Sequence, residues 1–361
     1  LKNLIKKKSN LINSLSVNYK DSYNKNLIKK FKNSKYYRII GMGGSILGAQ
    51  AIYHYLHNKV KKKFVFINNL QTTKKKFKKN PFTNLVISKS GTTIETIVNS
   101  NILLKKRDKN IFITENKKNY LYLLAEKLKA DIVHHNNFIG GRYSVLSEVG
   151  MLPAELMGLS SKNFRQFNFL IKNKKFLNSL VCNVSSILFY IKNKKYNSII
   201  INYDETAEDI FKWYQQLVAE SLGKNKTGIL PIVSNMPKDN HSVMQLYLDG
   251  FKNNFFTFFY THNNKSRKLN KSNLLLSQNL IENKNISNIL FAQKKATENV
   301  FNKKKIPFRS FEIIKRNEKT LGELFCFFIL ETILLGQALN LNPYDQPAVE
   351  LIKKETQKIL T

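Results

Sequence analysis

The sequence predicts an α/β protein made of two successive sandwiches, each with a parallel sheet between layers of helices. Short runs rich in β-branched and aromatic residues alternate with longer amphipathic segments, which is typical of parallel sheets covered by helices. The alternation occurs twice, from about residue 36 to 134 and again from about 196 to 339. A length of 361 residues with 42% apolar residues is enough for two cores.

The first half of the chain contains the first series of elements. Residues 1–34 are polar and basic with scattered apolar positions, and we expect peripheral helices there. The first sandwich follows in residues 35–160. We expect strands at 37–40, 64–67, 85–87, 111–114 and 132–134, and helices at 45–56, 93–105 and 120–128.

The second half repeats this organisation after a helical connector at 161–195. The second sandwich covers 196–340, with expected strands at 198–203, 228–233, 255–260 and 308–314. Its expected helices are 206–222, 241–248, 289–302 and 321–339, and the Asn/Lys/Ser-rich stretch 263–287 predicts a surface excursion. Residues 341–361 end the chain with a helix after Pro347, which suits a first helical position.

The chain is strongly basic, with 60 Lys and Arg residues against 24 Asp and Glu residues and a formal net charge of +36. Only seven of the basic residues are arginines, the side chain that most often reads and stacks on bases. The lysines are spread over the whole length, and the residues of A/T-rich codons (Lys, Asn, Ile, Phe, Tyr) are abundant together. Genomic composition accounts for this charge, and we expect no specific nucleic-acid partner.

The sequence also argues against a membrane protein and a metalloenzyme. No uncharged apolar run reaches 18 residues, and the nearest candidate, 324–339, contains Glu331, so we expect a buried helix and no membrane partner. Cys182 and Cys326 lie far apart in apolar surroundings, which predicts packed free thiols in a reducing, cytoplasmic compartment. The six histidines form no metal-ligand spacing, so we expect no metal.

Two junctions between a strand and a helix in the first half have the chemistry of an anion site. Strand 37–40 runs into the glycine-rich segment 41–48, which has neither the spacing of a dinucleotide fingerprint nor a Walker lysine, so we expect no cofactor there. Strand 85–87 runs into Ser-Lys-Ser-Gly-Thr-Thr at 88–93, where four hydroxyls and backbone N–H groups meet at a helix N-terminus. This suits one terminal phosphate, and the alternative is an ordinary capped helix.

Glu220 and Arg142 are candidate catalytic residues. Glu220 follows Ile210, Trp213 and Leu217 at helical spacing, so a carboxylate lies in line with an apolar stripe, as suits a general acid or base. The alternative is a carboxylate at the edge of the stripe that reaches water. Arg142 follows two glycines that allow a close backbone approach, although a structural salt bridge would explain it equally well.

His241, Gln346 and Lys353 are weaker candidates. His241 opens the expected helix 241–248, where the helix N-terminus favours a neutral histidine able to move a proton, although a lone histidine is usually structural. Gln346 and Lys353 stand seven residues apart on the expected final helix, so they would share a face with Glu350 between them. The alternative for Lys353 is an ordinary solvated lysine.

Taken together, six segments resemble the glucose-6-phosphate isomerase (phosphoglucose isomerase) family, whose members are built from two sugar-isomerase (SIS) domains. In the family's order, these segments are 41–45, 88–96, 140–147, 220–224, the region of residue 241, and 342–350. The resemblance implies two SIS-type, flavodoxin-like α/β sandwich domains with central parallel sheets and a C-terminal catalytic helix. It also implies reversible, metal-independent conversion of glucose 6-phosphate and fructose 6-phosphate through a cis-enediol(ate).

The same resemblance implies a role for each candidate residue. Glu220 would carry a proton between C2 and C1, and Arg142 would stabilise the negative charge of the intermediate. His241 and Lys353 would assist ring opening, with His241 contributed by the neighbouring subunit of a homodimer. The substrate, a sugar phosphate, would be bound by Gly44, Ser45, Ser88, Lys89, Ser90, Thr92, Thr93 and Gln346.

Some features depart from the family's pattern. The chain is shorter than most members at its N-terminal end, and Ala348 and Ile352 stand where the family usually has glycine. Lys354 directly follows Lys353, and we prefer Lys353 because it keeps the seven-residue spacing from Gln346.

Two alternative functions stay open within the same fold. A dual phosphoglucose/phosphomannose isomerase is one, although that branch usually carries Thr where this chain has Gln346. A non-catalytic SIS protein that senses sugar phosphates is the other. A sensor would need the segment 88–93 but not Glu220, His241 and Lys353 together.

Overall fold

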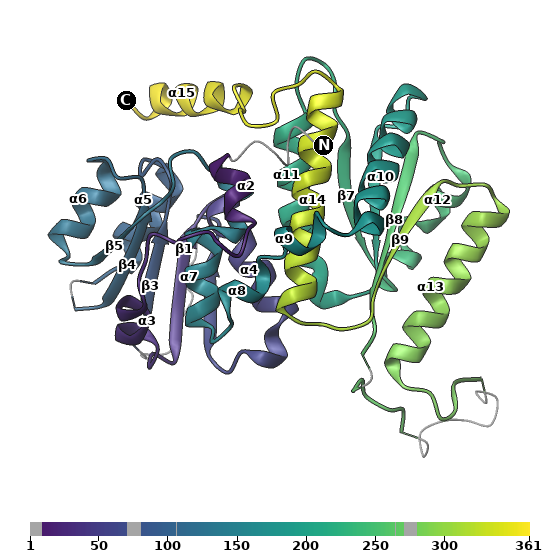
Figure 1. Ribbon diagram of the computed structural model, residues 1–361, viewed down its shortest axis with the longest axis horizontal. Helices are drawn as coiled ribbons and strands as arrows, with labels where there is room; N and C mark the ends of the chain where they lie inside the picture. Colours follow the sequence, from purple (N-terminus) through teal and green to yellow (C-terminus); the bar gives the residue numbers. More distant parts are fainter. Residues whose placement is uncertain (1–8, 71–80, 106, 264, 271–279) are drawn as a thin grey trace.

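The computed structural model of the protein describes residues 9–70, 81–105, 107–263, 265–270 and 280–361, and it contains two parallel β-sheets side by side (Figure 1). The first sheet has five strands in the order β2-β1-β3-β4-β5, and every neighbouring pair is parallel. The strands are β1 (Tyr36–Gly41), β2 (Lys63–Ile67), β3 (Thr83–Ile87), β4 (Lys109–Thr114) and β5 (Asp131–His134). The predicted α/β class with parallel sheets is confirmed.

Both faces of the first sheet are covered by helices. The helices that follow β1, β3 and β4 are α4 (Leu47–Tyr55), α5 (Ile94–Leu103) and α6 (Tyr120–Lys127), each within two residues of its expected ends. Because successive strand residues point to opposite faces, β1 contributes Ile39 to a large core with α4 and Ile40 to a smaller core beneath α5 and α6.

The second sheet repeats the strand order of the first, with four parallel strands arranged β7-β6-β8-β9. The strands are β6 (Asn197–Asn202), β7 (Leu230–Asn235), β8 (Asn254–Thr261) and β9 (Phe308–Ile313). One face packs on α11 (Glu208–Leu222) and α14 (Glu318–Ala338), and the other packs on α12 (Met244–Asp249) and α13 (Ile286–Lys303). The expected start of β7 at residue 228 is wrong: Gly228 has a φ of +145°, outside the strand region, and pairing with β6 begins at Leu230.

The two halves share one continuous core. Helix α4 of the first half packs against α11 of the second, and Ile52, Trp213 and Phe325 from α4, α11 and α14 belong to the same apolar cluster. The rings of Trp213 and Phe325 meet edge to face with centroids 4.8 Å apart. This packing brings α11 against two short 3₁₀ turns of the first half, η1 (Gly43–Ser45) and η3 (Gly141–Leu146).

Further helices lie before the first sheet and between the two sheets. The N-terminal part contains α2 (Asn10–Ser14) and α3 (Lys25–Phe31), and α7 (Glu148–Leu156) follows η3. Helices α8 (Ser161–Phe164), α9 (Phe167–Leu170) and α10 (Lys174–Lys192) occupy the expected connector. Of the expected excursion 263–287, residues 264 and 271–279 lie outside the described residues. The domain boundaries stay predictions.

Helix α14 has the length and the apolar composition of a membrane span, the only described helix that does. However, 83% of its most apolar window is buried inside the protein, as expected for a core helix that carries the fully buried Glu331. Cys326 on this helix is buried, and burial raises the pKa of its thiol. The expectation that both thiols are packed is wrong for Cys182, which lies exposed on α10 because that position faces away from the core.

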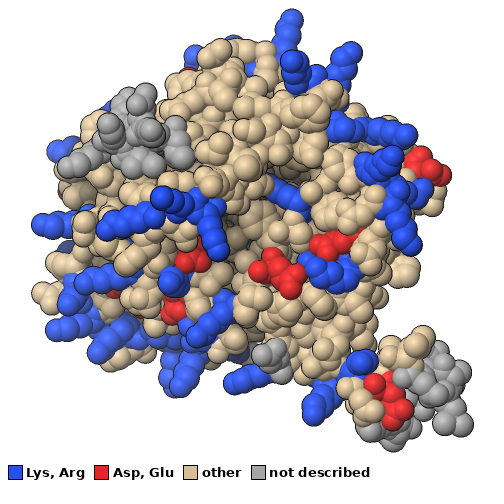
Figure 2. All heavy atoms as spheres, turned by 45° about the vertical axis from the view of Figure 1, so that its right-hand side comes forward, with Lys and Arg blue, Asp and Glu red and all other residues tan. Residues whose placement is uncertain are grey.

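The basic side chains do not form one stripe on the face shown in Figure 2. Lys and Arg side chains are spread over most of this face, and few acidic side chains lie among them. This distribution follows the scatter of lysines along the sequence.

Candidate active site

The candidate site lies where the turns that follow β1 and β5 meet the end of α11. Gly44, in η1, approaches Gly141 so closely that a Cβ atom would lie 2.1 Å from the carbonyl carbon of Gly141. Arg142 directly follows this contact, and its own carbonyl accepts a hydrogen bond of 3.1 Å from Trp213 Nε1. The glycine contact and the tryptophan therefore fix the backbone of Arg142, whose side chain is only 1% exposed.

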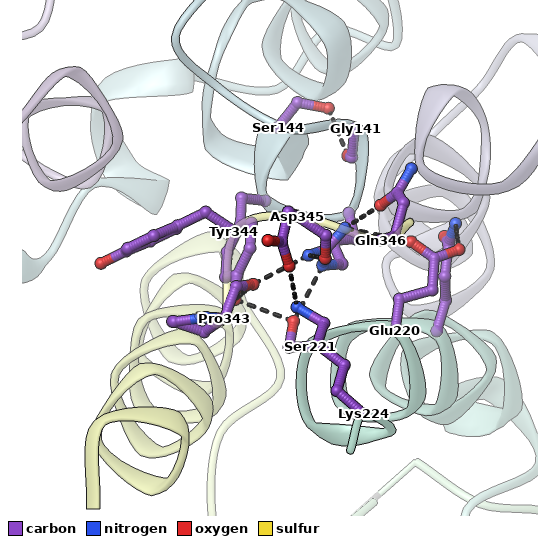
Figure 3. Close-up of polar contacts among 12 residues, drawn as sticks. Gly141, Ser144, Glu220, Ser221, Lys224, Pro343, Tyr344, Asp345 and Gln346 are labelled. Atoms are coloured by element: carbon purple, nitrogen blue, oxygen red, sulfur yellow. Dashed lines mark hydrogen bonds and ion pairs between the residues drawn. The ribbon is translucent and has the colours of Figure 1, made fainter. Parts of the chain in front are cut away.

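The Arg142 guanidinium has an acceptor for each of its five N–H groups. The acceptors are Ser221 Oγ (2.8 Å from Nε), Glu220 Oε2 (3.2 Å from Nη1), Gln346 Oε1 (from Nη1), and the carbonyl oxygens of Pro343 (2.8 Å from Nη2) and Asp345 (2.9 Å from Nη2). Figure 3 shows these groups converging from α11 and from the segment after α14. So many acceptors hold the buried cation in one orientation beside the Glu220 carboxylate.

Glu220 lies near the end of α11 and lines a cavity of about 630 Å³. The three apolar residues that precede it on the same face are buried, as predicted, whereas the Glu220 side chain is 26% exposed. Its Oε1 accepts a hydrogen bond from Gln216 Nε2 at 2.8 Å, and its Oε2 faces Arg142. The carboxylate is thus held from two sides and still borders a cavity of a size that accepts a small-molecule ligand.

Tyr143 and Ser221 support this arrangement from behind. The Tyr143 hydroxyl lies 2.8 Å from Ser221 Oγ and donates to the carbonyl of Pro343 at 2.9 Å. Burial raises the pKa of Tyr143 to about 12, so its hydroxyl stays protonated and able to donate at neutral pH. Ser221 and Gln216 were not predicted from the sequence, although Gln216 stands one helical turn before Glu220, a spacing that places the two on one face.

Residues 88–93 form a turn at the start of α5, which we call the anion loop. Ser88 is buried and its hydroxyl lies 2.9 Å from that of Thr93, while Thr92 donates through its hydroxyl to Ser90 Oγ at 3.1 Å. Thr93 is the N-cap residue, yet its side chain makes no capping hydrogen bond. Ser90 Oγ also accepts the backbone N–H of Thr92 at 3.3 Å, so these hydroxyls bond within the turn, and the anion site stays a prediction.

The anion loop is anchored by the next strand and helix. Gly91 has a φ of +65° and packs against Asn119. The Asn119 side chain caps α6 by accepting a hydrogen bond from the Tyr122 backbone N–H at 2.9 Å, and it donates a hydrogen bond to Thr114 Oγ1, also at 2.9 Å. Lys89 Nζ donates to the Asn137 carbonyl at 2.7 Å, so its ammonium is directed at that carbonyl rather than at the loop. The sequence analysis also missed Asn119, and its only signal was a favoured N-cap residue before an expected helix.

The sheet places the anion loop beside the other candidate residues. Gly41 at the end of β1 pairs with Ile87 at the end of β3, so η1 and the anion loop start from neighbouring strand ends. Gly44 and Ser45 lie in η1, and Gly44 contacts Gly141 next to Arg142. In parallel sheets, ligands bind at such carboxyl ends of neighbouring strands.

Two predicted catalytic residues lie apart from this cluster. Among the described residues, neither His241 nor Lys353 contacts Arg142 or Glu220. His241 does not open a helix as expected. It ends the 3₁₀ turn η5 (Lys238–His241), because Asp239 accepts the backbone N–H of Asn235 and closes a turn there, and α12 begins at Met244.

Lys353 belongs to α15 (Ala348–Leu360), which extends away from α14 and has no buried residue (Figure 1). Its ammonium contacts Glu350 at 2.6 Å and its side chain is 62% exposed. The expectation that Gln346 and Lys353 share a helix face is wrong. Gln346 precedes the helix, which begins after Pro347, and its side chain bonds to Arg142 instead.

Comparisons with known proteins identify the family of the chain. A family model described as phosphoglucose isomerase matches residues 27–361. The chain is 34% identical to the glucose-6-phosphate isomerase of Methanocaldococcus jannaschii, over 96% of this chain and 91% of that protein, and 31% identical to the glucose-6-phosphate isomerase of Mycoplasmopsis pulmonis, over 89% and 82%.

Solved structures share the fold. A hypothetical protein from Thermus thermophilus superposes with a TM-score of 0.86 at 19% identity and covers 99% of this chain and 92% of that one. A glucose-6-phosphate isomerase from Chlamydia trachomatis superposes with a TM-score of 0.76 at 18% identity, over 97% and 77%. The family match over nearly the whole chain and the shared fold lead to one conclusion: this chain belongs to the phosphoglucose isomerase family.

Proposed function

We propose that the protein is an aldose–ketose isomerase that interconverts D-glucose 6-phosphate and D-fructose 6-phosphate, a step of glycolysis and gluconeogenesis. One observation carries the proposal: the Glu220 carboxylate lines a cavity and lies 3.2 Å from the buried Arg142 guanidinium. An acid–base group beside a fixed cation is what proton transfer through an anionic intermediate needs. The anion loop supplies a place for the phosphate.

The isomerisation needs only proton movements. The Glu220 carboxylate takes the proton from C2 of the open-chain aldose, and the electron pair of that C–H bond forms the C1–C2 double bond while the carbonyl oxygen becomes negative. Glu220 then returns the proton to C1, and the hydroxyl proton of O2 moves to O1, which leaves a carbonyl at C2. No electrons enter or leave the substrate, so the reaction needs no redox partner.

Arg142 responds to the charge that moves during this step. Before proton transfer, Nη1 faces the negative Glu220 at 3.2 Å. When Glu220 takes the proton it becomes neutral, and the negative charge lies on the substrate oxygen instead. The guanidinium is already fixed by its other acceptors, so it favours this transfer without reorganising. Both Nη1 protons have partners beforehand, so the substrate must replace one of them.

Lys353 and His241, the two residues expected to assist ring opening, make no described contact with Arg142 or Glu220. We propose that Lys353 assists ring opening after α15 moves toward the cavity, and that His241 reaches the site of a second subunit in a homodimer. The exposed positions of both residues leave them available for such contacts. We also propose a cytoplasmic location, as suits an enzyme of sugar-phosphate metabolism.

Sharing of the site between subunits is testable by mixing two inactive variants. Homodimers of Glu220→Gln and of His241→Ala are each expected to lack activity. A mixed dimer would combine the intact Glu220 of one subunit with the intact His241 of the other, and so regain up to about a quarter of wild-type activity if subunits pair at random. If mixed dimers form and show no recovery, the shared site is wrong.

The proposed function is tested by measuring formation of glucose 6-phosphate from fructose 6-phosphate with a coupled dehydrogenase, with and without EDTA. We expect turnover that EDTA does not reduce. Loss of activity in EDTA would refute metal independence. An absence of turnover, with binding of sugar phosphate retained, would replace the proposed isomerase with the sensor.

The anion loop leads to a prediction about substrate binding. Gly91→Ala is expected to raise the KM for fructose 6-phosphate about tenfold or more, with a smaller effect on kcat. Alanine is strained at a φ of +65°, and its Cβ would lie 1.9 Å from Asn119 Oδ1, so the loop must shift. Initial rates over a range of substrate concentrations give both constants.

Gly158→Ala is the matched control for this variant. Gly158 also has a positive φ, +92°, but nothing lies within 4 Å of an added Cβ. It therefore reports the backbone strain without the collision at the anion loop. An unchanged KM in Gly91→Ala, or an equal change in both variants, would contradict a role of the loop in binding the substrate phosphate.

A further inference from the structure

Lys224 has a defined set of contacts that the proposed chemistry does not use. It follows the end of α11 by two residues, and its side chain is only 12% exposed. Its ammonium lies 2.5 Å from Asp345 Oδ1 and also donates to the carbonyl oxygen of Asn342 (Figure 3). Asn342 in turn donates to the second carboxylate oxygen of Asp345 at 2.9 Å. One lysine thus ties together both ends of the segment 342–345.

This segment supplies much of the environment of Arg142. The carbonyl oxygens of Pro343 and Asp345 accept from Arg142 Nη2, and the next residue, Gln346, accepts from Nη1. Residues 341–347 form neither helix nor strand, so regular backbone hydrogen bonding does not hold them in place. Their position depends on the side chains that bind them, and Lys224 is the one that joins them to the end of α11 beside Glu220.

We propose that Lys224, through Asp345, is a positioning residue that sets the geometry between Glu220, Arg142 and Gln346. This inference rests on the proposed isomerase function. The base is on the last turn of α11, and three of the five acceptors of the cation are on the segment 342–346. A clamp between these two parts fixes the base relative to the cation. Hydrogen bonding to Lys224 also holds the pKa of Asp345 below its usual value, so the clamp stays ionised at neutral pH.

A positioning residue affects the reaction rate, whereas a residue that only contributes to stability affects the unfolding of the protein. Loss of the clamp lets the segment shift by a fraction of an ångström to an ångström, and such a displacement of reacting groups costs up to about 100-fold in rate. An exposed ion pair that only stabilises the fold contributes little to stability and leaves kcat unchanged. The two roles therefore separate in the comparison of kcat with thermal stability.

The experiment compares Lys224→Met, Lys224→Arg and Asp345→Asn with wild type. We expect kcat for fructose 6-phosphate to fall about 10- to 100-fold in Lys224→Met, with KM within about threefold of wild type. Lys224→Arg keeps the charge and the donors and is expected to recover most of the rate. Asp345→Asn keeps the shape of its side chain and tests the clamp from the other end, even if Lys224→Met fails to fold.

Lys59→Met is the matched control. Lys59 pairs with Glu318 at 2.6 Å, at the opposite end of α14 from residues 341–347, and this variant is expected to keep wild-type kcat. An unchanged kcat in both clamp variants would overturn the proposal. So would a loss of rate in Lys59→Met as large as that in Lys224→Met, because the effect would then belong to stability alone.

A separate readout keeps this inference distinct from the isomerase proposal. Limited proteolysis reports whether the segment 341–347 is held, whatever the reaction is. We expect cleavage there to be about tenfold faster in Lys224→Met than in wild type, and unchanged in Lys59→Met. If wild type lacks isomerase activity, the proposed function fails, and equal cleavage in all variants would then refute the clamp independently.

Discussion

Replacing Glu220 with Gln is expected to reduce isomerase turnover by about 10³-fold or more, with little change in stability. The amide has the shape of the carboxylate but cannot accept a proton from C2, so the general-base contribution is lost. Its oxygen can still accept from Arg142 Nη1. Its NH₂ group would face Gln216, whose Oε1 is buried and lacks a hydrogen-bond partner among the described atoms. A flip of the Gln216 amide would accept this donor.

The test measures three quantities on the purified variant: kcat for fructose 6-phosphate, the midpoint of thermal unfolding, and exchange of a C1 proton of fructose 6-phosphate with deuterated water, since the base acts at C1 when the ketose is the substrate. Glu126→Gln is the control, because Glu126 lies exposed on α6, away from the described site. We expect loss of both turnover and exchange in Glu220→Gln only. Retained exchange at C1 would show that a different group removes the proton.

The fold was predictable from local patterns because parallel strands buried on both faces are short apolar runs between helices. Element ends were less predictable, since they depend on single backbone conformations. The late start of β7 follows from the positive φ of Gly228, and the turn that displaces His241 from a helix follows from the hydrogen bond to Asp239. Neither the backbone angle of Gly228 nor the hydrogen bond to Asp239 follows from a periodic pattern of apolar residues.

The candidate site was predictable only where its chemistry is local. The anion loop is one continuous segment, and Glu220 stands in an apolar stripe of its own helix, so both have sequence signals. Gln346 was predicted as a site residue, and the structure places its side chain against Arg142, but its expected position on the final helix was wrong, because it precedes α15. The supporting contacts of Ser221 and Lys224 join segments more than 75 residues apart, which no spacing rule reveals.

Replacing Arg142 with Lys is expected to lower kcat/KM by about 10²- to 10³-fold and also to lower the free energy of unfolding. Lysine keeps the positive charge, but its ammonium has three donors where the guanidinium has five, and it cannot reach acceptors on opposite sides at once. The Pro343 carbonyl keeps the Tyr143 hydroxyl as a donor, but the carbonyl oxygen of Asp345, which bonds to Nη2 in the wild type, would compete for the same ammonium as Glu220. Each buried acceptor left without a donor costs about 1–3 kcal/mol.

Arg165→Lys separates the electrostatic effect from the structural one. Arg165 is also buried, with a 2% exposed side chain, and it bonds to Asp21 at 2.6 Å and to the carbonyl of Leu146 at the other end of η3. This control is expected to lose stability without a comparable loss of kcat, because its charge faces Asp21 rather than the cavity. If both variants lose stability and rate in parallel, Arg142 acts only as a structural tie. If the rate falls in Arg142→Lys alone, the five hydrogen bonds of the Arg142 guanidinium are what orient its positive charge toward the intermediate.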